Sequence, residues 1–262
     1  MKLGLGLGLG SSIRQGLDFN AASFISRAGI TNPAQKTAIN NLVIALKGYG
    51  IWSKMVALYP YVGGSASSHA QNLVNSSFTI SWNGTVTHNA NGVTGNGSTG
   101  YGDTTCKASD VGVNGGLSTY LRALPTGDNN CSIGMQNASD RGYEIIMNVS
   151  FGQKYGIWGA TASIASQSTV PATGLYSVNR TSSTALTLYR NGSSIASDST
   201  SSSLSATALN IYTLALNNNG STSSFSEENC ALDAIHQGLT ASEESNFYTA
   251  VQSYQTALSR QV

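Results

Sequence analysis

The sequence predicts a mainly β protein: an antiparallel β-sandwich with an N-terminal extended arm, a small helical block and a C-terminal helix. Short apolar or alternating runs, separated by Gly, Asn, Ser and Asp clusters, recur from Phe78 to about Leu216. Helical spacing of apolar residues is confined to the flanks of this region, from Asp18 to Tyr59 and after Gly238. Strands without intervening helices favour an antiparallel sandwich over a parallel α/β sheet.

Residues 1–17 are predicted to form an extended arm. Glycine alternates there with four leucines, so an extended backbone places all four on one face: Leu3, Leu5, Leu7 and Leu9. Each leucine, if fully buried, would contribute on the order of 1.5 to 3 kcal/mol. We therefore expect the arm to be buried against another chain and to serve assembly, with a disordered terminus as the alternative. The segment lacks the compact apolar region and the Ala-x-Ala site of a signal peptide.

Residues 18–62 are predicted to form a helical collar. A first amphipathic helix ends at Gly29, and the segment Thr31-Asn32-Pro33 has the residues that begin a second one. We predict a third short helix after Gly50, which would turn these residues inward: Ile51, Trp52, Met55 and Leu58. The block is too small for an independent core, so we expect it to pack on the following domain or on a neighbouring subunit.

Residues 63–262 are predicted to form the sandwich, with a closing helix at about 240–258. The clearest strand signal surrounds Asn191-Gly192, because both residues of a tight hairpin turn must accept positive φ. Thr240 and Glu243 have capping-box spacing ahead of an apolar helical stripe. The candidate strands are residues 78–82, 119–124, 143–151, 154–159, 175–180 and 185–197.

Composition excludes several classes of partner. Charged residues make up 10% of the chain and the net charge is +1, so no summed potential attracts nucleic acid. The apolar runs fall short of the roughly 20 residues that a membrane span requires. The three cysteines, Cys106, Cys131 and Cys230, have no CxxC spacing and predict no zinc site. We expect buried thiols, and one disulfide remains open.

Catalytic patterns are missing from the sequence. His69, His88 and His236 lie outside motifs such as H-E-x-x-H, and we expect them to be structural. Hydrolysis of a glycosidic bond needs two carboxylates close together on one face. The acidic pair Glu227-Glu228 has no third carboxylate at the interval of an E-x-D-x-x-E strand. We therefore expect no catalytic residue and no enzymatic activity.

Aromatic residues near Asn-rich turns are the candidates for ligand binding. Sugar recognition uses an aromatic face for the apolar side of the ring, with amides and hydroxyls for its OH groups. The residues that fit this pattern are Trp82, Tyr101, Trp158 and Tyr189. Burial in the core is the commoner fate of such residues in a sandwich.

The C-terminal part of the chain resembles a known fold family. The segments LTLYRNGSSIA, NIYTLALNN and FSEENCALDAIHQGLTASEESNFYTAVQSYQ resemble the closing strands of laminin-G-type, or concanavalin-like, jelly rolls. The resemblance implies a concanavalin-like β-sandwich. Calcium-binding members use paired Asp or Asn ligands, and no matching spacing is found for Asp103, Asp110, Asp128 and Asp140. We therefore expect no cofactor, and no pattern supports calcium.

Further segments resemble structural proteins of tailed bacteriophages. They are FISRAGITNPAQKTAINNLVIALKGYGIWSKMVALYPYVGG, SSHAQNL and GLTASEESNFYTAVQSYQTALSRQV. The resemblance implies a place on the surface of the phage particle, as a head or tail fibre, appendage or decoration protein. We then expect the arm to bind other virion proteins, the chain to form a homo-oligomer, and host-surface glycan to be an additional ligand.

Two other functions stay open. The first is a stand-alone lectin-like carbohydrate-binding module, which the same aromatic residues would serve. The second is a glycan hydrolase, which the missing carboxylate pair makes the least favoured of the three.

Overall fold

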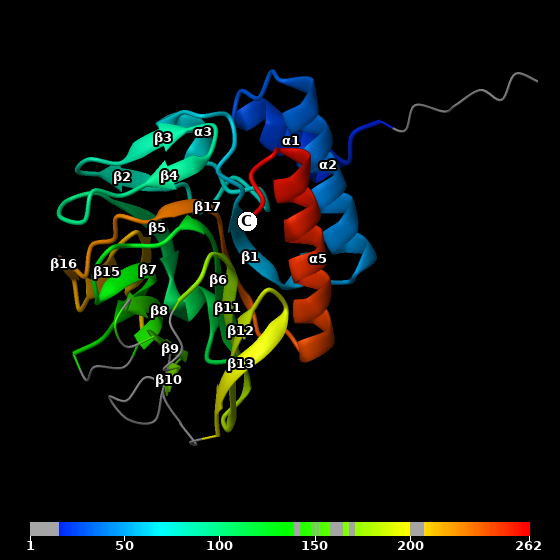
Figure 1. Ribbon diagram of the computed structural model, residues 1–262. Coiled ribbons are helices and arrows are strands. Elements are labelled where there is room, and N and C mark those ends of the chain that lie inside the picture. Colours follow the sequence, from blue (N-terminus) through cyan, green and yellow to red (C-terminus); the bar gives the residue numbers. More distant parts are fainter. Residues whose placement is uncertain are drawn as a thin grey trace, which may run out of the picture.

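The computed structural model describes residues 16–138, 142–148, 150, 152–157, 165–167, 171–199 and 207–262. The four arm leucines and Trp158 lie outside these residues. In the described part, two β-sheets face each other and a layer of helices lies on one side of them (Figure 1). The predicted mainly β sandwich with flanking helices is confirmed, and one parallel pair, β15–β7, joins the antiparallel ones.

The first sheet has eight strands in the described residues, in the order β13-β12-β11-β6-β17-β4-β3, with β1 beside β17. Its centre is formed by β11, β6 and β17, where Ser118 lies opposite both Ser177 and Ala234. Its strands are β1 (Met55–Tyr59), β3 (Thr87–Asn89), β4 (Gly92–Thr94), β6 (Gly115–Ala123), β11 (Gly174–Ser182), β12 (Ala185–Arg190), β13 (Ser193–Asp198) and β17 (Asn229–Gln237).

The second sheet has nine strands in the described part, in the order β10-β9-β8-β7-β14-β5-β2, with β15 beside β7 and β16 beside β15. Tyr212 lies opposite Asp103 on one side and Gly134 on the other. Its strands are β2 (Ser81–Asn83), β5 (Tyr101–Lys107), β7 (Asn130–Gln136), β8 (Gly142–Asn148), β9 (Gly152–Ile157), β10 (Ala165–Gln167), β14 (Asn210–Thr213), β15 (Leu216–Asn218) and β16 (Ser221–Ser223).

The space between the sheets holds the main hydrophobic core. Leu117, Val178 and Ile235 contribute from the first sheet, and Ile133 and Ile145 from the second; all five are fully buried. Strand alternation explains the arrangement, because every second side chain of a strand points to the same face. The other face of each sheet is then free to be covered or to remain at the surface.

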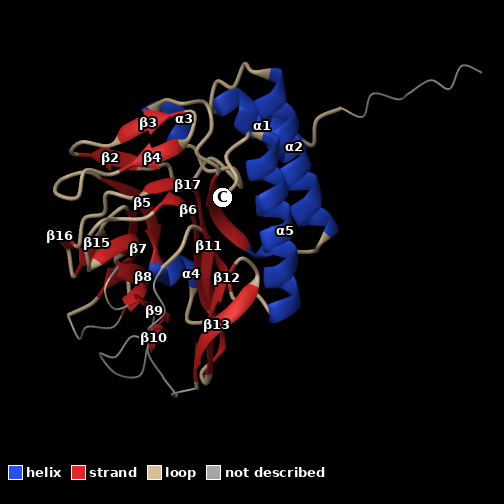
Figure 2. Ribbon diagram, viewed as in Figure 1, coloured by secondary structure: helices blue, strands red, loops and turns tan. Residues whose placement is uncertain are grey.

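Helices cover the outer face of the eight-stranded sheet (Figure 2). They are α1 (Phe19–Arg27), α2 (Pro33–Gly48) and α5 (Ala241–Ala257). Together with Tyr120, Leu175 and Leu232 from the sheet they form a second hydrophobic cluster. Within the predicted collar of residues 18–62, α1 and α2 thus pack on the sandwich, whereas β1 belongs to its first sheet. The described residues also form three short helices: η1 (Trp52–Lys54), α3 (Ala66–His69) and α4 (Ala108–Val111).

None of the helices in the described residues is long and apolar enough to cross a membrane.

Several local predictions are confirmed. Asn191 (φ 51°) and Gly192 (φ 75°) both have positive φ and join β12 to β13 as a tight hairpin. The predicted capping box is present at the start of α5, where Thr240 and Glu243 bond to each other's backbone N–H. The three cysteines are free and buried, so none of them forms a disulfide.

The predicted third helix is reduced to a single 3-10 turn, η1, and the prediction is wrong from Met55 on. Residues Met55–Tyr59 form β1, which pairs with β17. Ala57 and Tyr59 pack between the sheets, whereas Met55 and Leu58 pack under the helices. Because both faces of this strand are buried, its sequence is continuously apolar, and such a run cannot be told from a buried helix by periodicity.

Candidate functional site

A group of aromatic side chains lies on the outer face of the nine-stranded sheet. Alternation along β5 turns Tyr101 outward and Gly102 inward. The ring centroid of Tyr101 lies 4.8 Å from that of Tyr212 and 6.1 Å from that of Phe225. All three aromatic residues are half-buried. Tyr101, Asp103, Asn210, Tyr212 and Phe225 are called the aromatic face below.

Asp103 is the acidic member of the aromatic face. Its Oδ2 accepts a hydrogen bond from Asn210 Nδ2 at 3.1 Å, and its Oδ1 accepts one from the backbone N of Thr105 at 2.8 Å. The backbone carbonyl of Asn210 accepts in turn from Asn217 Nδ2 at 2.8 Å. The carboxylate is therefore held in place, and each of its oxygens retains capacity for a further donor.

Tyr212 keeps its proton at neutral pH. Burial raises the pKa of its hydroxyl, and the Asp103 carboxylate and the Tyr101 hydroxyl raise it further. A phenol in this state both donates and accepts hydrogen bonds. The aromatic face therefore offers ring surface, a hydroxyl, a carboxylate and an amide within one patch, which is the chemistry that sugar binding requires.

Of the predicted ligand-binding residues, Tyr101 belongs to the aromatic face. Trp82 lies on the neighbouring strand β2 but faces the interior, where its ring packs 6.1 Å from Tyr61 and its Nε1 donates to the Ala66 carbonyl at 2.9 Å. Tyr189 lies on the other sheet, on the helix-covered side, and only 7% of it is exposed. Trp158 falls outside the described residues. The structure therefore does not bring the predicted set together.

Sequence reasoning missed Tyr212, Phe225, Asp103 and Asn210. The alternation in Asn210–Thr213 does separate the buried Ile211 from Tyr212, so an outward tyrosine could have been inferred. The pairing of β14 with β5 could not be inferred from the sequence, because it joins segments about a hundred residues apart.

The three histidines are hydrogen-bonded within the fold. His69 accepts from the Gly64 backbone N at its Nε2 (3.2 Å), and its Nδ1 lies 3.1 Å from Nδ1 of His88. His69 must therefore donate to His88. Burial and the neighbouring His88 lower the pKa of His69 to about 3. His236 is fully buried, and its Nε2 lies 2.8 Å from Ser118 Oγ.

Asp233 and Glu228 are two of the carboxyl groups that are buried in the fold. Asp233 Oδ2 accepts from the Tyr61 hydroxyl at 2.7 Å and from Thr213 Oγ1 at 2.6 Å. Glu228 accepts from Ser132 at 3.0 Å, and burial raises its pKa to about 8. Both side chains are closed off from solvent.

The described residues contain no group of three or more His, Cys, Asp or Glu that could hold a metal ion.

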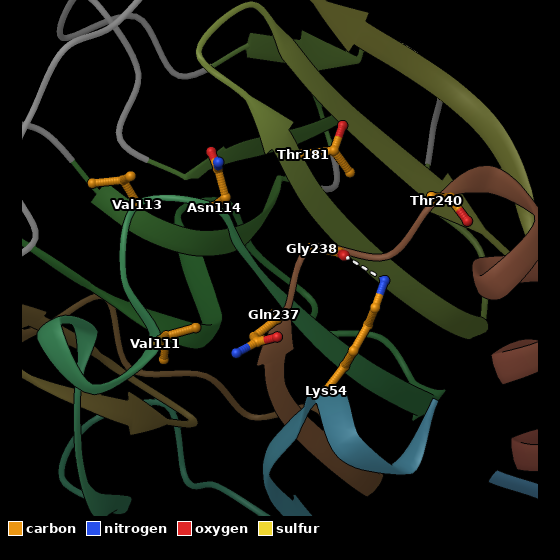
Figure 3. Close-up of a pocket in the computed structure, with 8 residues that line it drawn as sticks. All are labelled: Lys54, Val111, Val113, Asn114, Thr181, Gln237, Gly238 and Thr240. Atoms are coloured by element: carbon orange, nitrogen blue, oxygen red, sulfur yellow. Dashed lines mark hydrogen bonds between the residues drawn. The ribbon is translucent and has the colours of Figure 1, made fainter. Parts of the chain in front are cut away.

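A pocket of about 470 Å³ lies where β6, β11 and β17 meet η1 and the start of α5 (Figure 3). Lys54 crosses it, with Nζ 3.4 Å from the Gly238 carbonyl oxygen and 2.7 Å from Glu243 Oε2. Its described lining contains no aromatic ring, so it lacks a stacking surface. The lining residues are Lys54, Val111, Val113, Asn114, Thr181, Gln237, Gly238 and Thr240.

The chain is similar to solved structures of the same fold. It matches Trypanosoma rangeli sialidase in complex with sialic acid at 11% identity and a TM-score of 0.53, over 81% of this chain and 38% of the sialidase. A mutant of this sialidase displaying trans-sialidase activity matches at 11% identity and 0.52, over 83% and 39%. The binding domain of Paraclostridial Mosquitocidal Protein 1 matches at 11% identity and 0.52, over 78% and 53%. No family model and no curated protein matches the sequence.

These likenesses show a β-sandwich fold, and the chain spans about two fifths of the sialidase chains it matches. They also correct the expectation that the protein is not an enzyme. Sialidases share the fold, so the lack of an E-x-D-x-x-E strand is no basis for excluding activity. At 11% identity the likeness favours a related fold more than it favours a shared reaction. Nothing in these neighbours points to a phage particle.

Proposed function

We propose that the protein binds carbohydrate through the aromatic face. The observation that carries the proposal is the pair of half-buried rings, Tyr101 and Tyr212, 4.8 Å apart beside the fixed carboxylate of Asp103. Support also comes from the neighbours, since one sialidase structure contains sialic acid and another neighbour is a binding domain. Aromatic rings provide the contact for the apolar side of a sugar, and the polar groups bond its hydroxyls.

A glycan array followed by titration calorimetry tests this proposal. We expect wild type to bind at least one class of glycan, and Tyr212→Ala to weaken that binding at least tenfold. Tyr49→Ala is the matched control, because Tyr49 is 41% exposed and directly follows α2, in the helical layer that covers the other sheet. If no glycan binds, or if both variants bind like wild type, the proposal is wrong.

We further propose that this binding protein is an attachment component of a phage particle, on the surface of the virion. Support comes from the sequence resemblance and from exposed apolar residues where the predicted arm meets the helices: Leu17 is 46%, Phe19 82% and Ile44 44% exposed. Asp18 fixes this junction through an ion pair with Lys47 at 2.8 Å. The arm would bind other virion proteins, and the chain would form a homo-oligomer.

Deletion of residues 2–10 tests the attachment role. We expect the truncated protein to fold and to bind the same glycans, but to be lost from purified particles. Normal incorporation of the truncated protein would contradict the role of the arm without affecting the carbohydrate proposal.

A further inference from the structure

His69 and His88 form a hydrogen-bonded pair between two segments of the chain. His69 is the last residue of α3 and is 1% exposed, whereas His88 lies on β3 and is half-buried. Their Nδ1 atoms are 3.1 Å apart, and their ring centroids are 5.3 Å apart. The pair therefore joins α3 to β3, the strand beside it at the end of the eight-stranded sheet (Figure 1).

Neither ring of the pair can add a proton without losing a hydrogen bond. Because His69 Nε2 accepts from the Gly64 backbone N at 3.2 Å, the single proton of the neutral ring is on Nδ1. His69 Nδ1 then donates to His88 Nδ1, so His88 carries its own proton on Nε2. A proton added to His88 Nδ1 would leave two N–H groups facing each other. A proton added to His69 Nε2 would face the Gly64 N–H in the same way.

Within the described residues, the titratable groups that face the pair offer no counter-charge. Burial, His88 and the cation Arg260 lower the pKa of His69 to about 3, and burial lowers the pKa of His88. The ring of Tyr61 lies 5.8 Å from that of His69, and its hydroxyl is bonded to Asp233. In the described part of the chain, no carboxylate acts on the pKa of either histidine. His88 is the more exposed of the two and therefore takes up a proton first as pH falls.

The β3–β4 hairpin, which carries His88, is held to the sheet over a short length. β3 is the last strand in the sheet order and pairs with β4, and β4 pairs with β17 at Val93 and Thr94. On its other side, His88 contacts His69 of α3 and the ring of Trp82, whose centroid is 4.8 Å away. These side-chain contacts therefore contribute to holding the hairpin in place.

We propose that the His69–His88 pair is an acid-sensitive contact, which holds the β3–β4 hairpin against α3 at neutral pH and releases it when His88 is protonated. Because His88 is half-buried, its ring can then turn towards solvent. The hairpin loses its tie to α3 and keeps its short pairing with β17. Since the pKa of His88 in the folded protein lies below the usual 6.5, the contact is fully present above pH 6.5 and is lost at lower pH.

Amide hydrogen exchange over a pH series tests the proposal on the full chain. Between pH 7.5 and pH 4.5, after correction for the intrinsic pH dependence of exchange, we expect protection of residues 87–94 to fall at least tenfold. Protection of α2 and α5 should change much less over the same range. An NMR titration of the histidine side chains follows protonation of His88, and the loss of protection should follow that titration.

The variant His88→Asn is the matched control. The Oδ1 of asparagine can take nearly the position of the histidine Nδ1 and accept from His69, but it does not take up a proton. All other titratable groups are unchanged, so His88→Asn should keep the protection of residues 87–94 down to pH 4.5. Circular dichroism checks that the variant is folded.

Three results would overturn the proposal. The first is wild type that keeps its protection in residues 87–94 down to pH 4.5. The second is an equal loss in wild type and folded His88→Asn, because other groups would then cause it. The third, which decides if His88→Asn fails to fold, is protonation of His88 in wild type without loss of protection in the hairpin. None of these measurements uses a glycan, so they leave the carbohydrate proposal to its own test.

Discussion

The two outer faces of the sandwich differ in what covers them. Helices α1, α2 and α5 lie on the eight-stranded sheet (Figure 1), and polar residues there, such as Ser118, Ser177 and His236, are fully buried. At β5 and β14 of the nine-stranded sheet, Tyr101 and Tyr212 stay half-exposed. The same alternating strands thus supply stabilising contacts on one face and an accessible surface on the other. Whether helices cover the sheet face, rather than residue type, decides whether a side chain on that face is buried in the fold or accessible to a ligand.

The covered face contains a hydrogen-bonded row that runs from β17 to α5. His236 Nδ1 lies 2.9 Å from the carbonyl of Gln237 and must donate to it, so Nε2 accepts from Ser118. Ser118 Oγ lies 2.5 Å from Ser177 Oγ, so Ser177 donates to Ser118. The row reaches the fully buried Glu244 of α5 through a hydrogen bond with Ser177. Asn179 Nδ2 also donates to Glu244 Oε2 at 2.9 Å. Burial raises the pKa of Glu244 to about 7 and outweighs both hydrogen bonds, which lower it.

The largest expected contrast between the faces is in stability. Phe247 of α5 is fully buried, with its ring 5.8 Å from that of His236. Phe247→Ala should lower the free energy of unfolding by about 3 to 5 kcal/mol, because it leaves a cavity under the helix. Tyr212→Ala removes a half-exposed ring and should cost about 1 kcal/mol. Urea unfolding monitored by circular dichroism measures both, and equal losses would contradict the distinction between the faces.

A smaller effect is expected from pH. Burial raises the pKa of Glu244 to about 7 and that of Glu228 to about 8. Because the pKa of each carboxyl group in the folded protein lies above the usual 4.5, its protonated form stabilises the fold. This contribution to stability is fully present below pH 4.5 and is lost as pH rises through 7 to 8. Between pH 5.5 and pH 8.5 the loss should be about 2 kcal/mol for Glu244 and about 3 kcal/mol for Glu228.

Urea unfolding at pH 5.5 and pH 8.5 measures this loss. Glu244→Gln keeps the shape of the side chain but cannot ionise, so it should remove a large part of the alkaline loss. If Glu244→Gln loses as much stability as wild type between these pH values, ionisation of Glu244 is not the cause of the loss. On the acid side, burial lowers the pKa of His236 to about 4. The stability that the buried neutral imidazole contributes to the fold is therefore lost as pH falls below 6.5.

Local signals in the sequence were sufficient for much of the fold. Asn191 and Gly192 adopt the positive φ that the hairpin prediction requires, and Thr240 begins α5 with the predicted capping box. Both features depend only on neighbouring residues. By contrast, the strand Met55–Tyr59 was predicted as a helix, because burial on both faces removes the alternation that identifies a strand.

The candidate site was only partly predictable for a related reason. Tyr101 and Tyr189 both lie on alternating strands, and no local sequence pattern tells which of the two side chains is exposed. In the structure one is half-exposed and the other is buried beneath the helices. Two features of the site depend on pairing between distant segments. They are the choice of the sheet face that the helices cover and the position of Tyr212 beside Asp103.

Hydrogen–deuterium exchange with and without the tightest-binding glycan from the array locates the binding surface on the chain. We expect slower exchange on glycan addition in residues 101–107 and 210–213 and around Phe225, with no change in α2 or α5. Protection confined to the helical layer, or to the pocket around Lys54, would place the ligand elsewhere and contradict binding at the aromatic face.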